Sequence, residues 1–138
     1  MKESSLWNKV RKYSRAWGRV DRIENLAGTG QFDVDYCIDG REGWIELKVW
    51  PRKYRPSQAE FARQQYDNRG IAYVLVQVDK NVYLLRAMDY LQVCEAPRMD
   101  RREVVRLAVW SLKGSSWDML RVYMTSRLHA GVAKRSKA

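Results

Sequence analysis

The chain has little of the chemistry that many metal and redox sites require. Its 138 residues include one histidine, His129, and two cysteines, Cys37 and Cys94. These numbers exclude multi-histidine zinc sites, histidine-based catalytic triads, zinc ribbons and a disulfide framework. Both cysteines lie in apolar stretches, so we expect two buried thiols. Any catalysis must therefore rest mainly on carboxylates and lysines.

Long apolar segments are also absent. No run approaches the roughly 18 apolar residues of a membrane span. Residues 1–5 lead into a polar, periodic segment and not into the apolar centre of a signal peptide. The length suits one globular domain. We expect no membrane partner and a cytoplasmic location, which would be the host cytoplasm for a viral protein.

Positive charge is in clear excess. Lysine and arginine number 26 against 16 aspartates and glutamates, which gives a net charge of +10. The excess lies in residues 1–22 and 98–138, whereas the middle of the chain is nearly balanced and holds most carboxylates. Basic domains of this kind bind polyanions through their phosphates, so DNA is the expected partner. The alternative is a basic protein without such a partner.

Hydropathy periodicity predicts an α/β fold with a mixed β-sheet flanked by helices. An Asp39-Gly40 turn favours a hairpin between the second and third strands. Ser57 and Glu60 fit a capping box that opens the second helix, and Gly70 is expected to end it. The expected helices are 3–17, 57–68, 87–91, 101–112 and 116–128, and the expected strands are 19–25, 32–38, 44–50, 71–78 and 82–85.

One constellation on the predicted hairpin points to metal chemistry. Glu46 and Lys48 share a face of strand 44–50, opposite the apolar face of Ile45 and Leu47. Neighbouring strands lie about 4.8 Å apart, so Asp33 on the preceding strand can approach Glu46. Two convergent carboxylates form a hard-oxygen site for Mg²⁺ or Mn²⁺. A solvated strand face is the alternative interpretation of Glu46 and Lys48.

Three segments resemble the PD-(D/E)XK nuclease superfamily, and most closely its VRR-NUC branch of small stand-alone, phage-type proteins. The segments are Gly30-Gln31-Phe32-Asp33, Trp44-Ile45-Glu46-Leu47-Lys48 and Arg55-Pro56-Ser57-Gln58. The resemblance spans residues 19–85. It departs from the family pattern at Phe32, where the family has a proline that is not a catalytic group.

The resemblance implies a restriction-endonuclease-like core and a set of site residues. Asp33, Glu46 and the main-chain carbonyl of Leu47 would bind Mg²⁺, for which Mn²⁺ substitutes. Lys48 would position water and stabilise charge, and Gln58 would face the site from a helix N-terminus. Asp35 is a rival to Asp33, which is favoured because it follows Gly30 at the family spacing.

Further residues are candidates for supporting roles. Glu3 or Glu24 could complete the acidic site, although both also fit ordinary surface carboxylates. Arg52, Lys53, Tyr54 and Arg55 form a basic-aromatic loop that suits a DNA strand, by phosphate contact and stacking; an exposed basic linker fits equally well. The basic tail adds Lys134, Arg135 and Lys137 as DNA contacts.

The combined expectation is a metal-dependent DNA endonuclease that leaves a 5′-phosphate. Residues 1–97 would form the nuclease core, and residues 98–138 a basic helical extension and tail of the same domain. A homodimer could act on branched, Holliday-junction-like DNA, because two opposed cuts need two sites. The alternatives are a non-catalytic nucleic-acid-binding or inhibitor protein on the same scaffold, and a subunit of a phage DNA-processing assembly.

Overall fold

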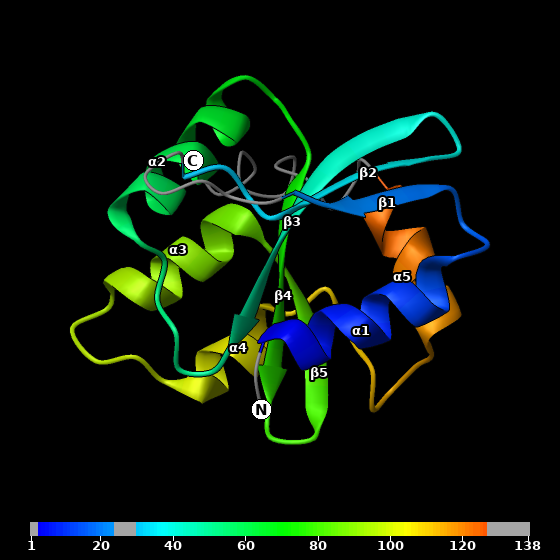
Figure 1. Ribbon diagram of the computed structural model, residues 1–138. Coiled ribbons are helices and arrows are strands. Elements are labelled where there is room, and N and C mark those ends of the chain that lie inside the picture. Colours follow the sequence, from blue (N-terminus) through cyan, green and yellow to red (C-terminus); the bar gives the residue numbers. More distant parts are fainter. Residues whose placement is uncertain (1–2, 24–29, 127–138) are drawn as a thin grey trace.

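The computed structural model describes residues 3–23 and 30–126, which form a mixed six-stranded sheet between helices (Figure 1). The strands follow one another across the sheet in chain order, and only β3 and β4 are parallel. The predicted α/β class is confirmed. The strands are β1 (Arg19–Arg22), β2 (Val34–Ile38), β3 (Arg41–Val49), β4 (Ala72–Val78), β5 (Asn81–Arg86) and β6 (Trp110–Ser111).

Helices cover both faces of the sheet (Figure 1). On one face lie α1 (Glu3–Ser14) and α5 (Trp117–Met124), whose Tyr13 and Trp117 rings stack with centroids 5.0 Å apart. On the other face lie α2 (Pro56–Asp67), α3 (Ala87–Glu95) and α4 (Arg101–Leu107). The fold therefore has three layers, with the connection between the parallel strands β3 and β4 running through α2.

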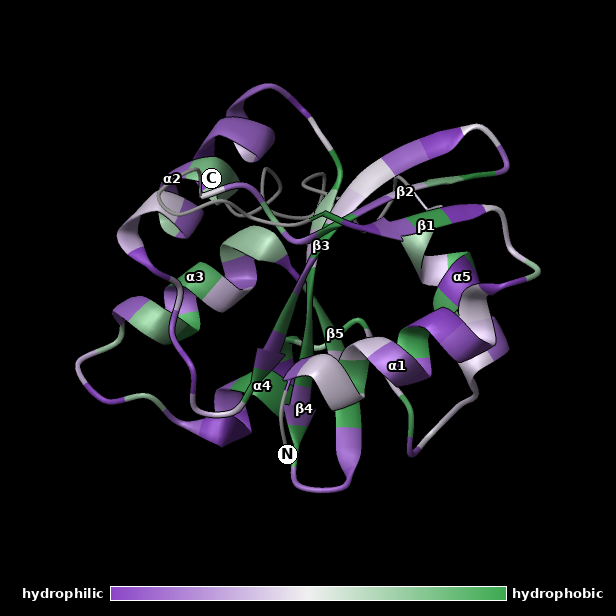
Figure 2. Cartoon of the chain, viewed as in Figure 1, coloured by the Kyte–Doolittle hydropathy of each residue, from purple (hydrophilic) through white to green (hydrophobic). Residues whose placement is uncertain are grey.

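The two cores follow from the alternation of side chains along the strands. Ile45 and Leu47 of β3 join the core under α1 and α5, while the flanking Trp44 and Trp50 pack on the opposite core. All seven residues of β4 are buried, as expected of a central strand with helices on both sides. Figure 2 shows the resulting band of hydrophobic residues along the inner strands.

The β2–β3 hairpin sets the position of the acidic residues. Asp39 (φ 52°) and Gly40 (φ 75°) both have positive φ, the conformation that two-residue hairpin turns require. The register that follows pairs Val34 with Ile45 as the last ladder pair. Asp33 immediately precedes Val34 and Glu46 immediately follows Ile45, so the two residues lie next to each other just beyond this pair.

The start and end of α2 differ from the prediction. The helix begins at Pro56, and Ser57 lies in its first turn, so the proposed Ser57–Glu60 capping box is wrong. Pro56 suits the first helical position because its φ is preset and its missing N–H would be unpaired there. At this N-terminal end, Gln58 Oε1 accepts a hydrogen bond from Arg55 N (3.0 Å) and so caps the helix. Arg69 (φ 59°), ahead of Gly70, takes the left-handed conformation after the helix.

The C-terminal segment also departs from the prediction. The helix expected over 101–112 ends at Leu107, and Trp110–Ser111 form β6, which pairs with β5. The apolar residues of this segment fit both the helical period and the strand period. The hydrogen bonds with β5 therefore decide that it forms a strand. Ser116 caps α5, and its side chain accepts a hydrogen bond from Met119 N. Trp110 and Trp117 are buried in the core under α1.

The two cysteines differ in their burial. Cys94 is buried as expected, whereas Cys37 is only partly buried because it lies on the face of β2 opposite to the buried Val34, Tyr36 and Ile38. No helix within residues 3–23 and 30–126 has the length and apolarity to cross a membrane.

Candidate active site

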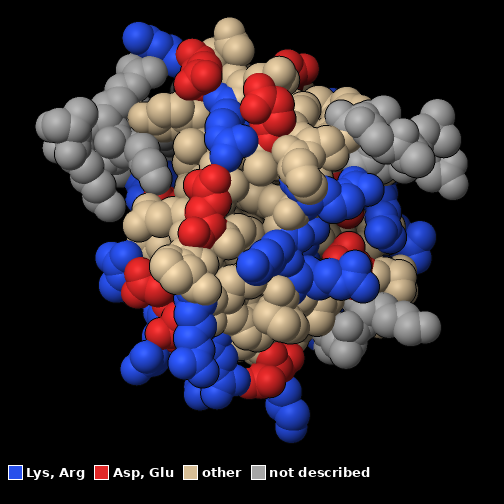
Figure 3. Space-filling view, turned by 90° about the vertical axis from the view of Figure 1, so that its left-hand side faces the viewer, with Lys and Arg blue, Asp and Glu red and all other residues tan. Residues whose placement is uncertain are grey.

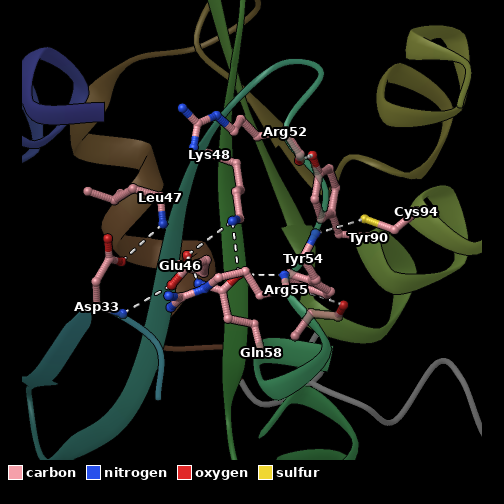
Figure 4. A network of polar contacts seen from close by, with 11 residues as sticks. Asp33, Glu46, Leu47, Lys48, Arg52, Tyr54, Arg55, Gln58, Tyr90 and Cys94 are labelled. Atoms are coloured by element: carbon pink, nitrogen blue, oxygen red, sulfur yellow. Dashed lines mark hydrogen bonds and ion pairs between the residues drawn. The ribbon is translucent and has the colours of Figure 1, made fainter. Parts of the chain in front are cut away.

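The site lies where β2 separates from β3. Beyond the last ladder pair, side-chain oxygens take over the hydrogen bonds of the strands: Asp33 N donates to Glu46 Oε1 (3.2 Å), and Leu47 N donates to Asp33 Oδ1 (3.1 Å). Figure 4 shows both carboxylates beside this gap. Asp33 and Glu46 are therefore fixed against the backbone of each other's strand.

Gln58 connects β3 to the first turn of α2. Its Nε2 donates to Glu46 Oε2 (2.6 Å), and its Oε1 accepts from Lys48 Nζ (2.9 Å) as well as from the Arg55 amide (Figure 4). Lys48 Nζ also lies 3.5 Å from Glu46 Oε2. One glutamine thus holds the carboxylate and the ammonium in fixed positions.

These polar side chains are almost fully buried. Asp33 is 8% exposed, Glu46 2%, Lys48 5% and Gln58 3%. The predicted polar face of β3 is therefore not a solvated face, because α2 and the loop before it cover the strand. Two carboxylates and one ammonium in this space leave an excess of negative charge.

The charges respond to this burial. Desolvation first, and the neighbouring Asp33 second, raise the pKa of Glu46 to about 8, against the opposing effect of Lys48. Desolvation also raises the pKa of Asp33, against the hydrogen bond from Leu47 N and the positive charge of Arg22. An added cation would relieve the repulsion between the two carboxylates.

A cavity of about 800 Å³ opens above the carboxylates. Asp33, Glu46 and Lys48 form its floor. One wall comes from α1 and β1 and holds Glu3, Arg22 and Ile23; the other comes from the β3–α2 loop and α2 and holds Arg52, Lys53, Arg55 and Gln58. Figure 3 views the molecule from the α2–α3 side and shows Lys and Arg side chains gathered around a smaller acidic area.

The other acidic candidates have different outcomes. Glu3 lies in the cavity and adds to the negative potential at Asp33 and Glu46. Asp35 does not reach the cavity, because it forms an ion pair with Arg19 (3.2 Å) on the surface of β2. Glu24 lies outside the described residues. Glu3 was a candidate for the acidic site, and the packing of α1 on β3 places it at the cavity.

The basic loop divides into exposed and buried members. Arg52, Lys53 and Arg55 are exposed and line the cavity. Tyr54 was expected to stack on a base, but it is 8% exposed, its ring packs on Phe32 and Tyr90, and its hydroxyl donates to Ala87 O (2.8 Å). Tyr54 anchors the loop to the core and is not available for stacking. Lys134, Arg135 and Lys137 lie outside the described residues.

The oxygen atoms at the floor of the cavity are of the kind that binds a hard divalent cation. Residues 3–23 and 30–126 hold no group of three or more His, Cys, Asp or Glu side chains close enough to form a metal site. Two carboxylates converge, and the Leu47 amide faces Asp33. Because a strand residue directs its N–H and C=O to the same side, the Leu47 carbonyl is a third oxygen donor on this side of β3. Oxygen donors of this kind suit Mg²⁺ or Mn²⁺.

Comparison with known proteins gives no assignment. No protein-family model matches the chain, and no curated protein matches it significantly. The function must therefore be inferred from the residues and the geometry of the site.

Proposed function

We propose that this protein is a metal-dependent DNA endonuclease that hydrolyses phosphodiester bonds. The observation that carries the proposal is the buried Asp33–Glu46 pair with Lys48 at the floor of a cavity whose rim is cationic. The two carboxylates would bind a metal ion, and the basic residues around them would attract a polyanion to the same place. The net charge of +10 supports the same partner.

Each residue of the floor has a defined role. Asp33, Glu46 and the Leu47 carbonyl would hold Mg²⁺, or Mn²⁺ in its place, which supplies charge to polarise the phosphate and activate water. Lys48 is held by Gln58 and Glu46 with its ammonium at the floor, where it positions the attacking water and stabilises charge on the phosphate oxygens. Gln58 is a positioning residue. The resemblance to PD-(D/E)XK nucleases implies a 5′-phosphate product.

The substrate and the assembly are further parts of the proposal. A homodimer acting on branched DNA stays a prediction, and so does a cytoplasmic location. Part of the apolar surface of α1 and α5 is used inside the chain, since these two helices pack on each other. Tyr13, Met119 and Val122 remain 42–47% exposed on these two helices and would suit a partner.

The test is cleavage of a panel of labelled linear, nicked, single-stranded and four-way-junction DNA with Mg²⁺ or Mn²⁺. The wild type should cut at least one substrate, and EDTA should stop it. Glu46→Gln removes a ligand charge and should reduce the rate by at least a hundredfold, whereas Glu42→Gln changes an exposed glutamate of the same strand and should cut normally.

Two outcomes would contradict the proposal. Equal rates for the Glu46 and Glu42 variants would show that the chemistry lies elsewhere. DNA binding without cleavage under any metal condition would favour the non-catalytic nucleic-acid-binding or inhibitor protein. A subunit of a phage DNA-processing assembly would become active only with its partners.

A further inference from the structure

Arg22 occupies a position on the cavity wall that the proposed chemistry does not yet use. It is the last residue of β1 and pairs with Val34, directly after Asp33 in sequence. The next residue, Ile23, donates its amide to Asp33 O (2.7 Å), so β1 is bonded to the backbone of the acidic residue. The side chain of Arg22 lines the cavity, and its charge acts on Asp33.

The contrast with Arg19, three residues earlier on the same strand, shows what is special about Arg22. The Arg19 guanidinium is neutralised by Asp35 (3.2 and 3.3 Å) and Asp21 (3.2 Å). Arg22 is exposed, and its side chain forms no ion pair or hydrogen bond with another of residues 3–23 and 30–126. No group within those residues therefore occupies its guanidinium donors.

The opposite wall carries positive charge as well. Arg52, Lys53 and Arg55 are exposed on the β3–α2 loop, and the carboxylates of the floor lie between this loop and Arg22. A guanidinium offers a planar set of donors that matches a phosphate group. An anionic chain that crosses the floor would meet a cation on each side.

We propose that Arg22 binds a phosphate of the substrate strand on the α1 side of the phosphate that is cut. Together with the basic loop on the other wall, it holds one nucleic-acid strand across Asp33 and Glu46. The inference rests on the proposed function, because it places that substrate in that cavity. Arg22 acts on a phosphate neighbouring the reacting one and is a substrate-positioning residue.

The test compares Arg22→Ala, Arg22→Lys and Arg19→Ala with the wild type. Binding of a fluorescent single-stranded oligonucleotide is measured in EDTA at several salt concentrations, and cleavage of the same strand is measured with Mg²⁺ or Mn²⁺. Loss of one phosphate contact should lower the slope of log K against log salt by about 0.7–1 for Arg22→Ala. Arg22→Lys should keep the slope, and Arg19→Ala should bind and cut like the wild type.

The outcomes separate this inference from the proposed function. A wild type that cuts DNA while Arg22→Ala keeps its salt slope and kcat/KM would overturn the role of Arg22 and leave the nuclease proposal standing. If the wild type binds DNA but never cuts it, and only Arg22→Ala has a lower salt slope than the wild type, the nuclease proposal is overturned and the phosphate contact is supported. Equal losses in the Arg22→Ala and Arg19→Ala variants, or no binding by the wild type, would overturn the role of Arg22.

Discussion

Replacing Glu46 by glutamine should change the stability of the metal-free protein in opposite directions at low and high pH. The pKa of this carboxyl rises from the model-compound value of 4.5 to about 8 in the folded protein, mainly through burial. Because the folded pKa lies above the unfolded one, the native state keeps the proton longer than the unfolded state does. The free energy of unfolding must therefore fall as pH rises from about 4.5 through about 8.

The size of the effect follows from the shift. Each pKa unit is worth about 1.4 kcal/mol, so the full shift sets an upper bound of about 5 kcal/mol on the stability lost at high pH. Glutamine carries no charge to desolvate, but it has one acceptor oxygen where Glu46 uses two, for Asp33 N and for Gln58 Nε2. Losing one of these hydrogen bonds costs about 1–2 kcal/mol. The variant should thus be about 1 kcal/mol less stable than the wild type near pH 5 and about 3 kcal/mol more stable near pH 9.

Urea unfolding followed by tryptophan fluorescence in EDTA measures both ends of this range. Asp33, Lys48 and Glu3 also surround the carboxyl, and they are present in both proteins. Wild type and variant are therefore compared in the same buffer at each pH. Glu42→Gln, at an exposed position of β3, should follow the wild-type pH profile. If Glu46→Gln and the wild type show the same pH dependence, Glu46 is not a desolvated carboxyl and the electrostatic argument for a cation fails.

Three further outcomes are expected. Tyr54→Phe keeps the ring but loses the bond to Ala87 O, so urea unfolding should show a loss of about 1 kcal/mol, while DNA affinity stays unchanged; an unchanged free energy of unfolding would show that this bond does not anchor the loop. Gly30→Ala introduces a side chain at positive φ (69°) against the Ser57 backbone of α2, so cleavage should fall at least tenfold while circular dichroism still shows a folded protein; wild-type cleavage would show that this contact does not position Asp33. Light scattering at micromolar concentration should give about twice 16.3 kDa if the homodimer forms, and a mass of 16.3 kDa would exclude it under those conditions.

Part of the site follows directly from local sequence rules. The Asp39-Gly40 turn fixes the hairpin register, and a fixed register places Asp33 and Glu46 at the same point of neighbouring strands. Lys48 follows from the two-residue period of a strand. Gln58 depends on where α2 begins, which the resemblance indicated better than the predicted capping box did.

Other parts depend on contacts that sequence patterns do not contain. Tyr54 looks like a loop aromatic in sequence, and only the pocket formed with Phe32 and Tyr90 buries it. Glu3 and Arg22 reach the cavity because α1 packs on the sheet and β1 pairs with β2, two long-range choices. The short strand β6 was missed because its apolar residues also fit a helical period.

A metal-binding measurement shows whether Asp33 and Glu46 form a divalent-cation site. Electron paramagnetic resonance of Mn²⁺ titrated with protein reports the free ion and therefore the number of ions bound. The expected result is one bound Mn²⁺ for each wild-type or Glu42→Gln chain and a loss of at least tenfold in affinity for Glu46→Gln. A wild type that leaves Mn²⁺ free at millimolar concentration, or a Glu46→Gln variant that binds as tightly as the wild type, would contradict it.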